Sequence, residues 1–222
     1  MIREFGTNEV WLLLLGLRWT LLLAVVALVC GCFGGLVVLV LRIAPFRAIR
    51  IGTAVFIKLF QGLPLLILLF LVFFGTNLIG FRTEAWTATA IAFTLYASVF
   101  LGEIWRGCVE AIPRGQWDAA TALGLGFLRS LWLVIGPQAG RIALPPTVGF
   151  LVQLIKGTSL ASIVGFEELT RTAQLVNNAT FQPLFVFTLV AVLYFLLCWP
   201  LSWLSLRLEL RLKRNLGHGA AS

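Results

Sequence analysis

The residues of this chain that could do chemistry are polar side chains set inside or beside long apolar runs. They are Lys58, Gln61, Glu103, Gln153 and Lys156. A lysine at the centre of a bilayer costs about 2.5–3.5 kcal/mol on insertion scales, so such side chains usually face a bundle interior or a water-filled cavity. Groups placed in this way are suited to binding a polar solute, and we predict recognition by them, not bond breaking.

Lys156 is followed by Gly157, Thr158 and Ser159, a sequence that can loosen a helix. A cation beside locally unwound backbone can receive a substrate carboxylate, as in the broken helices of transporters. We therefore predict a solute path that includes Glu103, Gln153, Lys156, Thr158 and Ser159. Two structural roles for Lys156 stay open, an ion pair with Glu103 and snorkelling to a membrane interface. For Lys58 snorkelling towards the cytoplasm is favoured.

Catalytic and metal sites are not predicted. One histidine and four scattered cysteines are too few for a metal site, and Cys30 and Cys32 point to different faces of a helix because they are two residues apart. The phosphate-binding pattern GxxxxGK[ST] does not occur in the sequence. We therefore expect no cofactor bound by this chain and no ATP hydrolysis by the chain alone.

The composition is that of a polytopic membrane protein. The 222 residues are 60% hydrophobic and 12% charged, which is too little charge to cover a soluble domain of this size. The net charge of +8 does not indicate nucleic acid, because the basic residues stand at the ends of apolar runs, where topology signals lie.

Five apolar runs predict five membrane spans in a single all-α domain that covers residues 1–222. Their approximate bounds are 19–41, 51–74, 85–103, 144–165 and 183–204. The first run begins near residue 10 and contains Arg18, so we divide it into an interfacial helix over 9–18 and a span. Gly62 and Pro64 should kink the second span. Pro145 and Pro146 suit the first turn of the fourth span.

The orientation follows from the lysines and arginines of the connecting segments. Loop 42–50, loop 104–143 and the C-terminal tail hold eleven of them, and the N-terminus with loops 75–84 and 166–182 holds three. The positive-inside rule places the N-terminus outside and the C-terminus in the cytoplasm. The acids Glu84, Glu167 and Glu168 then lie on the outer side.

The segment 106–141 is a polar, glycine-punctuated loop on the predicted cytoplasmic side. Pro113 and Gly115 should break the helix that leaves the third span. Asp118 then opens a short run of small residues, where an acid in the first turn suits the helix dipole, and Gly124 ends it. A small-residue helix lets another protein approach closely, although an interfacial re-entrant connector would also fit this pattern.

The spacing within this loop resembles the permease subunits of bacterial ATP-binding-cassette importers. Their pattern is Glu-Ala-Ala, three residues, Gly, nine residues, then Ile-x-Leu-Pro. Here Asp118-Ala119-Ala120, Gly124 and Val134-Ile135-Gly136-Pro137 keep the spacing, with Asp, Val and Gly as replacements. The polar amino-acid uptake family adds motifs that match Gly115-Gln116-Trp117, Pro137-Gln138-Ala139-Gly140-Arg141 and Lys156-Gly157-Thr158-Ser159-Leu160. The likeness runs from about residue 16 to residue 211.

The resemblance implies the type I importer fold and a subunit that carries the solute path in the bacterial inner membrane. It implies a second permease subunit, identical or homologous, two cytoplasmic ATPase subunits that use ATP and Mg²⁺, and an outer amino-acid-binding protein. By this resemblance Gly115, Asp118, Ala119, Ala120 and Gly124 couple the permease to the ATPase. The outer loops 75–84 and 167–178 would receive the binding protein.

The sequence departs from the family pattern in the second span. The usual Arg-Gly-Thr-Pro is Gln61-Gly62-Leu63-Pro64 here, which removes one buried charge and can change the substrate preference. Two other functions stay open. One is an ion-coupled secondary transporter or channel that acts alone, and the other is a membrane anchor for a signalling ATPase.

Overall fold

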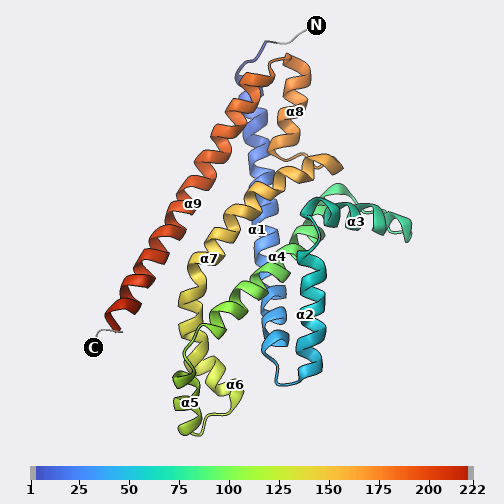
Figure 1. Cartoon of the computed structure of the whole chain (residues 1–222). Helices are drawn as coiled ribbons and strands as arrows, with labels where there is room; N and C mark the ends of the chain where they lie inside the picture. Colours follow the sequence, from blue (N-terminus) through green and yellow to red (C-terminus); the bar gives the residue numbers. More distant parts are fainter. Residues whose placement is uncertain (1–3, 220–222) are drawn as a thin grey trace.

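The computed structural model describes residues 4–219 of the chain, with side chains up to Arg214. This part of the chain is helical throughout and contains no strand. Long helices form an open bundle, with the N-terminus and α8 (Leu169–Thr180) at one end and α5 (Arg114–Ala122) at the opposite end (Figure 1). The expected all-α architecture is confirmed.

The first helix, α1 (Thr7–Ile43), runs unbroken through both segments that the sequence analysis separated. The predicted division at residue 18 is wrong because nothing there ends a helix. The run 9–19 contains no proline, and the Arg18 guanidinium lies 5.3 Å from the centre of the Trp19 ring, where it needs no break in the backbone. This α-helix of 37 residues is longer than the stretch needed to cross a bilayer.

Small residues form the seam between α1 and α4 (Ala85–Glu110), the most extensive helix contact in the described chain. Gly31 faces Ala97, Gly34 faces Ser98, and a Cβ added at Gly102 would lie 2.5 Å from Cγ1 of Val38. Close approach of backbones through small residues is the usual way in which helices associate inside membranes. This seam fixes the position of the two helices against each other.

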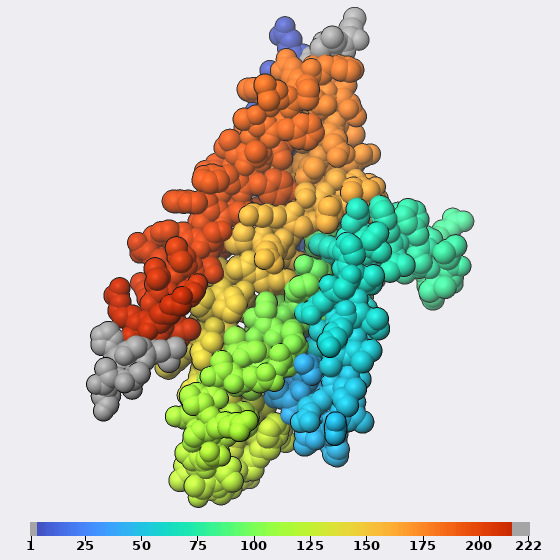
Figure 2. Space-filling model, viewed as in Figure 1, coloured from blue at the N-terminus to red at the C-terminus, as the bar shows by residue number. Residues whose placement is uncertain are grey.

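The predicted second span consists of two helices, α2 (Arg47–Gln61) and α3 (Leu65–Leu78), bent by 97° against each other. The expected break at Gly62 and Pro64 is therefore confirmed, and it is sharper than a kink. Pro64 cannot continue the hydrogen-bond ladder of α2, and it stands at the N-cap of α3. Figure 2 shows the end of α3 standing away from the body of the molecule.

The fourth predicted span begins eight residues earlier than expected, because α7 covers Gly136–Gly157. Pro145 and Pro146 thus lie inside the helix and not in its first turn, which Pro137 occupies instead. Beyond Gly157 the chain continues as a 3₁₀ segment, Thr158–Val164. This segment is ended by Gly165, which has a φ of 86°. This change of helix type confirms that the sequence after Lys156 loosens the α-helix.

The last helix, α9 (Pro183–Gly219), packs along α7 and against α8. Within the described residues, four continuous helical segments are long and apolar enough to span a membrane, and there are up to five spans if the bent pair of α2 and α3 is counted as one. Large apolar side chains such as Phe33, Phe195 and Leu196 are exposed along these helices, as lipid-facing or subunit-facing surfaces require.

Candidate functional site

The helix α5 forms the tip of the molecule opposite the N-terminus (Figure 1). It begins directly after Pro113, four residues before the predicted start, so Asp118 lies in its middle and Gly115 lies inside the helix. The predicted start at Asp118 and the predicted break at Gly115 are therefore wrong. Pro113 is well suited to start a helix, and the run after it contains no further proline. Gly124 has a φ of 74°, the left-handed conformation that commonly ends a helix and that glycine adopts without strain.

One face of α5 is anchored to the rest of the loop. Ala120 is 1% exposed, and the Trp117 ring stacks on Phe127 with a centroid distance of 5.8 Å. Gln138 Nε2 on α7 donates a hydrogen bond of 3.2 Å to Gln116 Oε1. Ala120 therefore holds the helix in place and is not available to a partner.

The other face of α5 is open. Gly115, Asp118 and Ala119 are exposed, and Leu123 at the end of the helix is 78% exposed. We call these four residues the docking face. It offers two positions without a long side chain, one carboxylate and one large apolar side chain, a combination that suits contact with another protein surface.

A π-helical turn, Leu131–Ile135, connects the loop to α7, after the short helix α6 (Phe127–Ser130). The Gly136 N–H donates to the Leu131 carbonyl, and a Cβ at Gly136 would lie only 2.7 Å from that oxygen. Pro137 has no N–H to extend the regular ladder, so the turn widens here. Ile135 is fully buried against α4 and α7 residues, which joins α5 mechanically to the spans.

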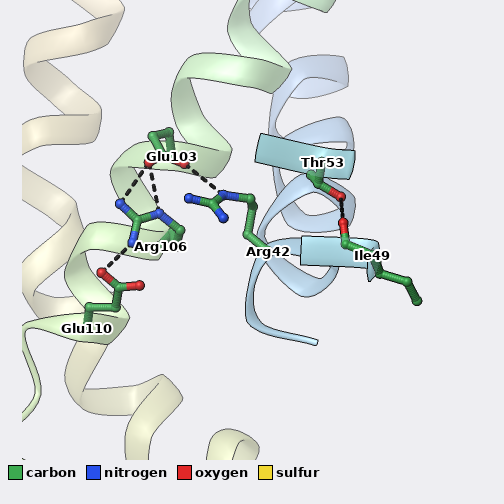
Figure 3. A network of polar contacts seen from close by, with 6 residues as sticks. All are labelled: Arg42, Ile49, Thr53, Glu103, Arg106 and Glu110. Carbon is green, nitrogen blue, oxygen red and sulfur yellow. Dashed lines mark hydrogen bonds and ion pairs between the residues drawn. The ribbon is translucent and has the colours of Figure 1, made fainter. Parts of the chain in front are cut away.

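Four charged residues form a cluster where α1 ends beside α4 (Figure 3). Glu103 Oε1 lies 2.7 Å from Nη2 of Arg106, and Glu103 Oε2 lies 3.4 Å from Nε of Arg42. Arg106 also pairs with Glu110 one turn further on. Arg42 and Arg106 thus occupy the carboxylate that was expected in the solute path, and the alternative ion pair between Glu103 and Lys156 does not form.

The other residues of the predicted path divide into two groups. Gln153 and Lys156 are exposed on α7, and Ser159 is half-buried with its hydroxyl donating to the Lys156 carbonyl over 2.8 Å. Thr158 is fully buried, and its Oγ1 donates to the Ile155 carbonyl over 2.7 Å. Gln153, Lys156 and Ser159 are therefore accessible to a solute, whereas Thr158 is not.

A buried carboxylate was missed by the sequence analysis, which treated Glu168 as an outer-loop acid. Its side chain is 0% exposed and accepts hydrogen bonds from Tyr194 Oη at 3.0 Å, the Arg171 N–H at 2.9 Å and Thr20 Oγ1 at 3.4 Å. Burial raises the pKa of the Glu168 carboxyl, and these hydrogen bonds oppose the rise. The position before Leu169 was the available signal, because an acid commonly caps a helix start.

Long apolar helices, a break in the second span and a projecting helical loop define the membrane-embedded part of a transport protein. Residues 27–214 match the family described as the binding-protein-dependent transport system inner membrane component. The chain belongs to this family and is a multi-pass inner-membrane permease component of a transporter complex.

Curated relatives agree with this assignment over most of their length. The chain is 33% identical over 183 residues to the probable amino-acid ABC transporter permease protein YckA of Bacillus subtilis, covering 82% of this chain and 81% of YckA. It is 35% identical over 203 residues to the arginine ABC transporter permease protein ArtQ of Haemophilus influenzae, covering 88% of this chain and 90% of ArtQ.

Solved structures share the fold. The crystal structure of an amino acid ABC transporter with histidines matches with a TM-score of 0.87 and 28% identity, covering 95% of this chain and all of that chain. An inward-facing MetNI methionine ABC transporter matches with a TM-score of 0.72 and 21% identity over 91% of this chain and 97% of that chain, a likeness of fold alone. The predicted type I importer fold is thereby confirmed.

Proposed function

We propose that this chain is the permease subunit of an ATP-driven importer of amino acids. The observation that carries the proposal is the docking face on α5, which a helix at the tip of the molecule presents to solvent. The likeness to permeases named for amino acids, glutamine and arginine supports the solute class.

The chain itself catalyses no reaction and binds no cofactor in this proposal. Two ATPase subunits bind ATP and Mg²⁺, and each receives one docking face. A second permease subunit, identical or homologous, completes the solute path. An amino-acid-binding protein delivers the solute to the loops 75–84 and 167–178 on the outer side.

The same proposal fixes the orientation, with the N-terminus outside and the C-terminus in the cytoplasm. The docking face then lies in the cytoplasm, where the ATPase is. Closure of the ATPase pair would move α5 as a rigid body together with α4 and α7, because Ile135 and its neighbours bind the three helices into one cluster. The spans would thereby open alternately to either side.

Lys156 is the candidate partner of the solute carboxylate. It is exposed at the end of α7, one residue before the α-helix changes to the 3₁₀ segment, and it makes no ion pair with any described residue. Gln153 stands one turn earlier on the same helix and is also exposed. A lysine recognises any α-carboxylate, so this contact serves amino acids in general.

ATPase activity of the reconstituted complex tests the proposal. The chain is purified with its associated subunits, placed in vesicles, and assayed with and without a panel of amino acids and the outer binding protein. We expect stimulation by one class of amino acids.

Two results would contradict the proposal in different ways. If no ATPase co-purifies and the chain alone moves solute, it is a secondary transporter or channel. If an ATPase co-purifies but no solute changes its rate, the chain is an anchor and not a conduit.

A further inference from the structure

A continuous apolar groove lies between the end of α1 and the segment that leads from α6 into α7. Two cavities, of about 540 and 850 Å³, share the lining residues Val40, Ile43, Leu131 and Trp132 and so form one hollow. Volumes of about 300–1,000 Å³ are typical of small-molecule sites. The hollow is therefore large enough to hold part of a ligand.

The inner part of this groove is mainly apolar. Its walls include Leu36, Leu39, Ala143 and Leu144, and its polar side-chain atoms come only from Trp105, Trp132 and Thr147. Trp105 Nε1 donates to Thr147 Oγ1 over 3.0 Å, so the Trp105 N–H already has a partner within the wall. An alkyl chain is the occupant that matches such a surface.

The outer part of the groove carries a cation. Arg129 lines it beside Pro45, Phe127 and Trp132, and it makes no hydrogen bond or ion pair with any residue that the structure describes. Trp132 is 70% exposed at this point, where an indole ring suits the boundary between headgroups and hydrocarbon. An anion at the mouth and an alkyl chain inside would complement the whole groove.

A second copy of the chain cannot easily supply that anion. On the α5 end of the bundle, Glu103 and Glu110 are paired with Arg106, and Glu209 pairs with Lys213 at 2.7 Å. Asp118 belongs to the docking face. A soluble subunit could not reach the level of Leu36, two turns inside α1 from its end at Ile43.

We propose that this groove binds one anionic phospholipid from the leaflet on the α5 side of the membrane. Its acyl chain lies along Leu36, Trp132 and Leu144, and its phosphate binds Arg129. The lipid would fill the space between α1 and α7 and support the connection of the segment 106–141 to the spans. The proposal is independent of the transported solute.

Native mass spectrometry of the intact transporter complex tests this site. The complex is transferred to detergent from vesicles that contain equal amounts of phosphatidylglycerol and phosphatidylcholine, and the lipids retained on the permease are counted. Wild type should retain phosphatidylglycerol preferentially. Arg129→Gln should lower that preference about fivefold, since one cation at a membrane surface contributes about 1 kcal/mol. Arg141→Gln removes an exposed arginine outside the groove and should leave the preference for phosphatidylglycerol unchanged.

Groove-filling variants form the second arm. A side chain at Gly140 meets no atom within 4 Å of its Cβ, so Gly140→Phe can enter the groove, and it should remove retention of both lipids. Gly52→Phe on α2 has the same free space, lies outside the groove and should keep the retained lipid. If Gly140→Phe fails to assemble with its partner subunits, Leu144→Trp serves the same purpose from an exposed position.

Three results would overturn the site. They are equal retention of the two lipids by wild type, equal effects of Arg129→Gln and Arg141→Gln, and unchanged retention in both groove-filling variants. A photoreactive side chain in place of Trp132 gives a fourth test. Cross-links to phospholipid support the proposal, whereas cross-links to a second permease copy or to the ATPase would refute it.

Discussion

Glu168 ties three helices together through a single carboxylate. Tyr194 comes from α9, Thr20 from α1, and Arg171 supplies its backbone N–H from the first turn of α8. Thr20 Oγ1 also accepts the Leu169 N–H over 3.1 Å. Removing the carboxylate would take the Glu168 acceptor from the Thr20 and Tyr194 hydroxyls and from the Arg171 N–H, and a lost hydrogen bond commonly costs about 0.5–1.5 kcal/mol.

The stability of this junction should depend on pH. Because burial raises the pKa of Glu168 in the folded protein, the folded state holds this proton to higher pH than the unfolded state does. The stabilisation is complete below the ordinary glutamate pKa of about 4.3 and is lost as pH rises through the folded-state pKa. Glu168→Gln keeps an acceptor but does not ionise, so the unfolding temperature of wild type minus that of the variant should fall with rising pH.

Thermal unfolding of the purified complex at a series of pH values measures this difference. Subtracting the variant cancels other titrating groups, such as those of the cluster around Glu103. A difference in unfolding temperature that stays constant from acid to neutral pH would show that Glu168 has the same pKa in the folded and the unfolded protein, which would contradict the prediction. Glu167→Gln, at an exposed neighbouring position, is the control and should leave the profile unchanged.

At the scale of elements, α5 is held in place by Gln116, Trp117 and Ala120, which lie outside the docking face. Gly124 is exposed, with no atom within 4 Å of an added Cβ, so a large side chain there would meet nothing within this chain. Gly124→Arg should therefore leave the protein in the membrane and abolish transport, because the side chain projects into the partner's surface. Solute uptake at matched expression measures the loss.

The backbone conformation at Gly124 requires its own control. A φ of 74° strains most side chains but is tolerated by asparagine, so Gly124→Asn separates strain from bulk. We expect Gly124→Asn to retain most of the uptake. Normal uptake by Gly124→Arg would show that α5 does not couple the permease to an ATPase.

The seam between α1 and α4 offers a matched pair of variants on one helix. Gly102→Leu would drive a side chain into Val38, whereas Gly107→Leu meets no atom within 4 Å of its Cβ. Overpacking commonly costs about 1–3 kcal/mol. Gly102→Leu should lower the unfolding temperature and the yield of assembled complex, and Gly107→Leu should change neither. Equal behaviour of the two variants would mean that the seam is open in the working protein.

Local signals in the sequence predicted some elements and not others. The break at Gly62 and Pro64 and the end of α5 at Gly124 were predictable because glycine and proline act on the backbone directly. The unbroken course of α1 was not, since hydropathy marks a membrane boundary and says nothing about where a helix stops. Pro145 inside α7 was misplaced for a related reason, because surrounding helices can stabilise a proline that would end an isolated helix.

The candidate site was predictable to the same extent. Motif spacing predicted a coupling role for Asp118, Ala119 and Ala120 alike, but only packing shows that Ala120 is buried while Asp118 and Ala119 are exposed. Glu103 was expected to face a solute because its partners Arg42 and Arg106 were assigned to loops. The distances that join these three side chains depend on the packing of α1 against α4, which no local pattern encodes.

At the scale of the whole molecule, the two ends differ in chemistry. The end that holds α5 carries the charged cluster of Figure 3 and an apolar groove with one arginine at its mouth. The opposite end joins α1, α8 and α9 around a carboxylate that no described cation neutralises. This asymmetry suits a protein that meets different partners on the two sides of a membrane.

The asymmetry leads to a prediction of sidedness that single cysteines can test. Leu123 on the docking face and Phe81, in the connection between α3 and α4, are both more than two-thirds exposed. In a background without the four native cysteines, a membrane-impermeant maleimide should label Phe81→Cys in intact cells and Leu123→Cys only after the membrane is opened. The reason is that the arginine-rich segments around α5 stay in the cytoplasm during insertion. Labelling of Leu123→Cys from outside would show that the orientation is the opposite one. The docking face would then lie away from any cytoplasmic ATPase, and the proposal of an ATP-driven importer would lose its basis.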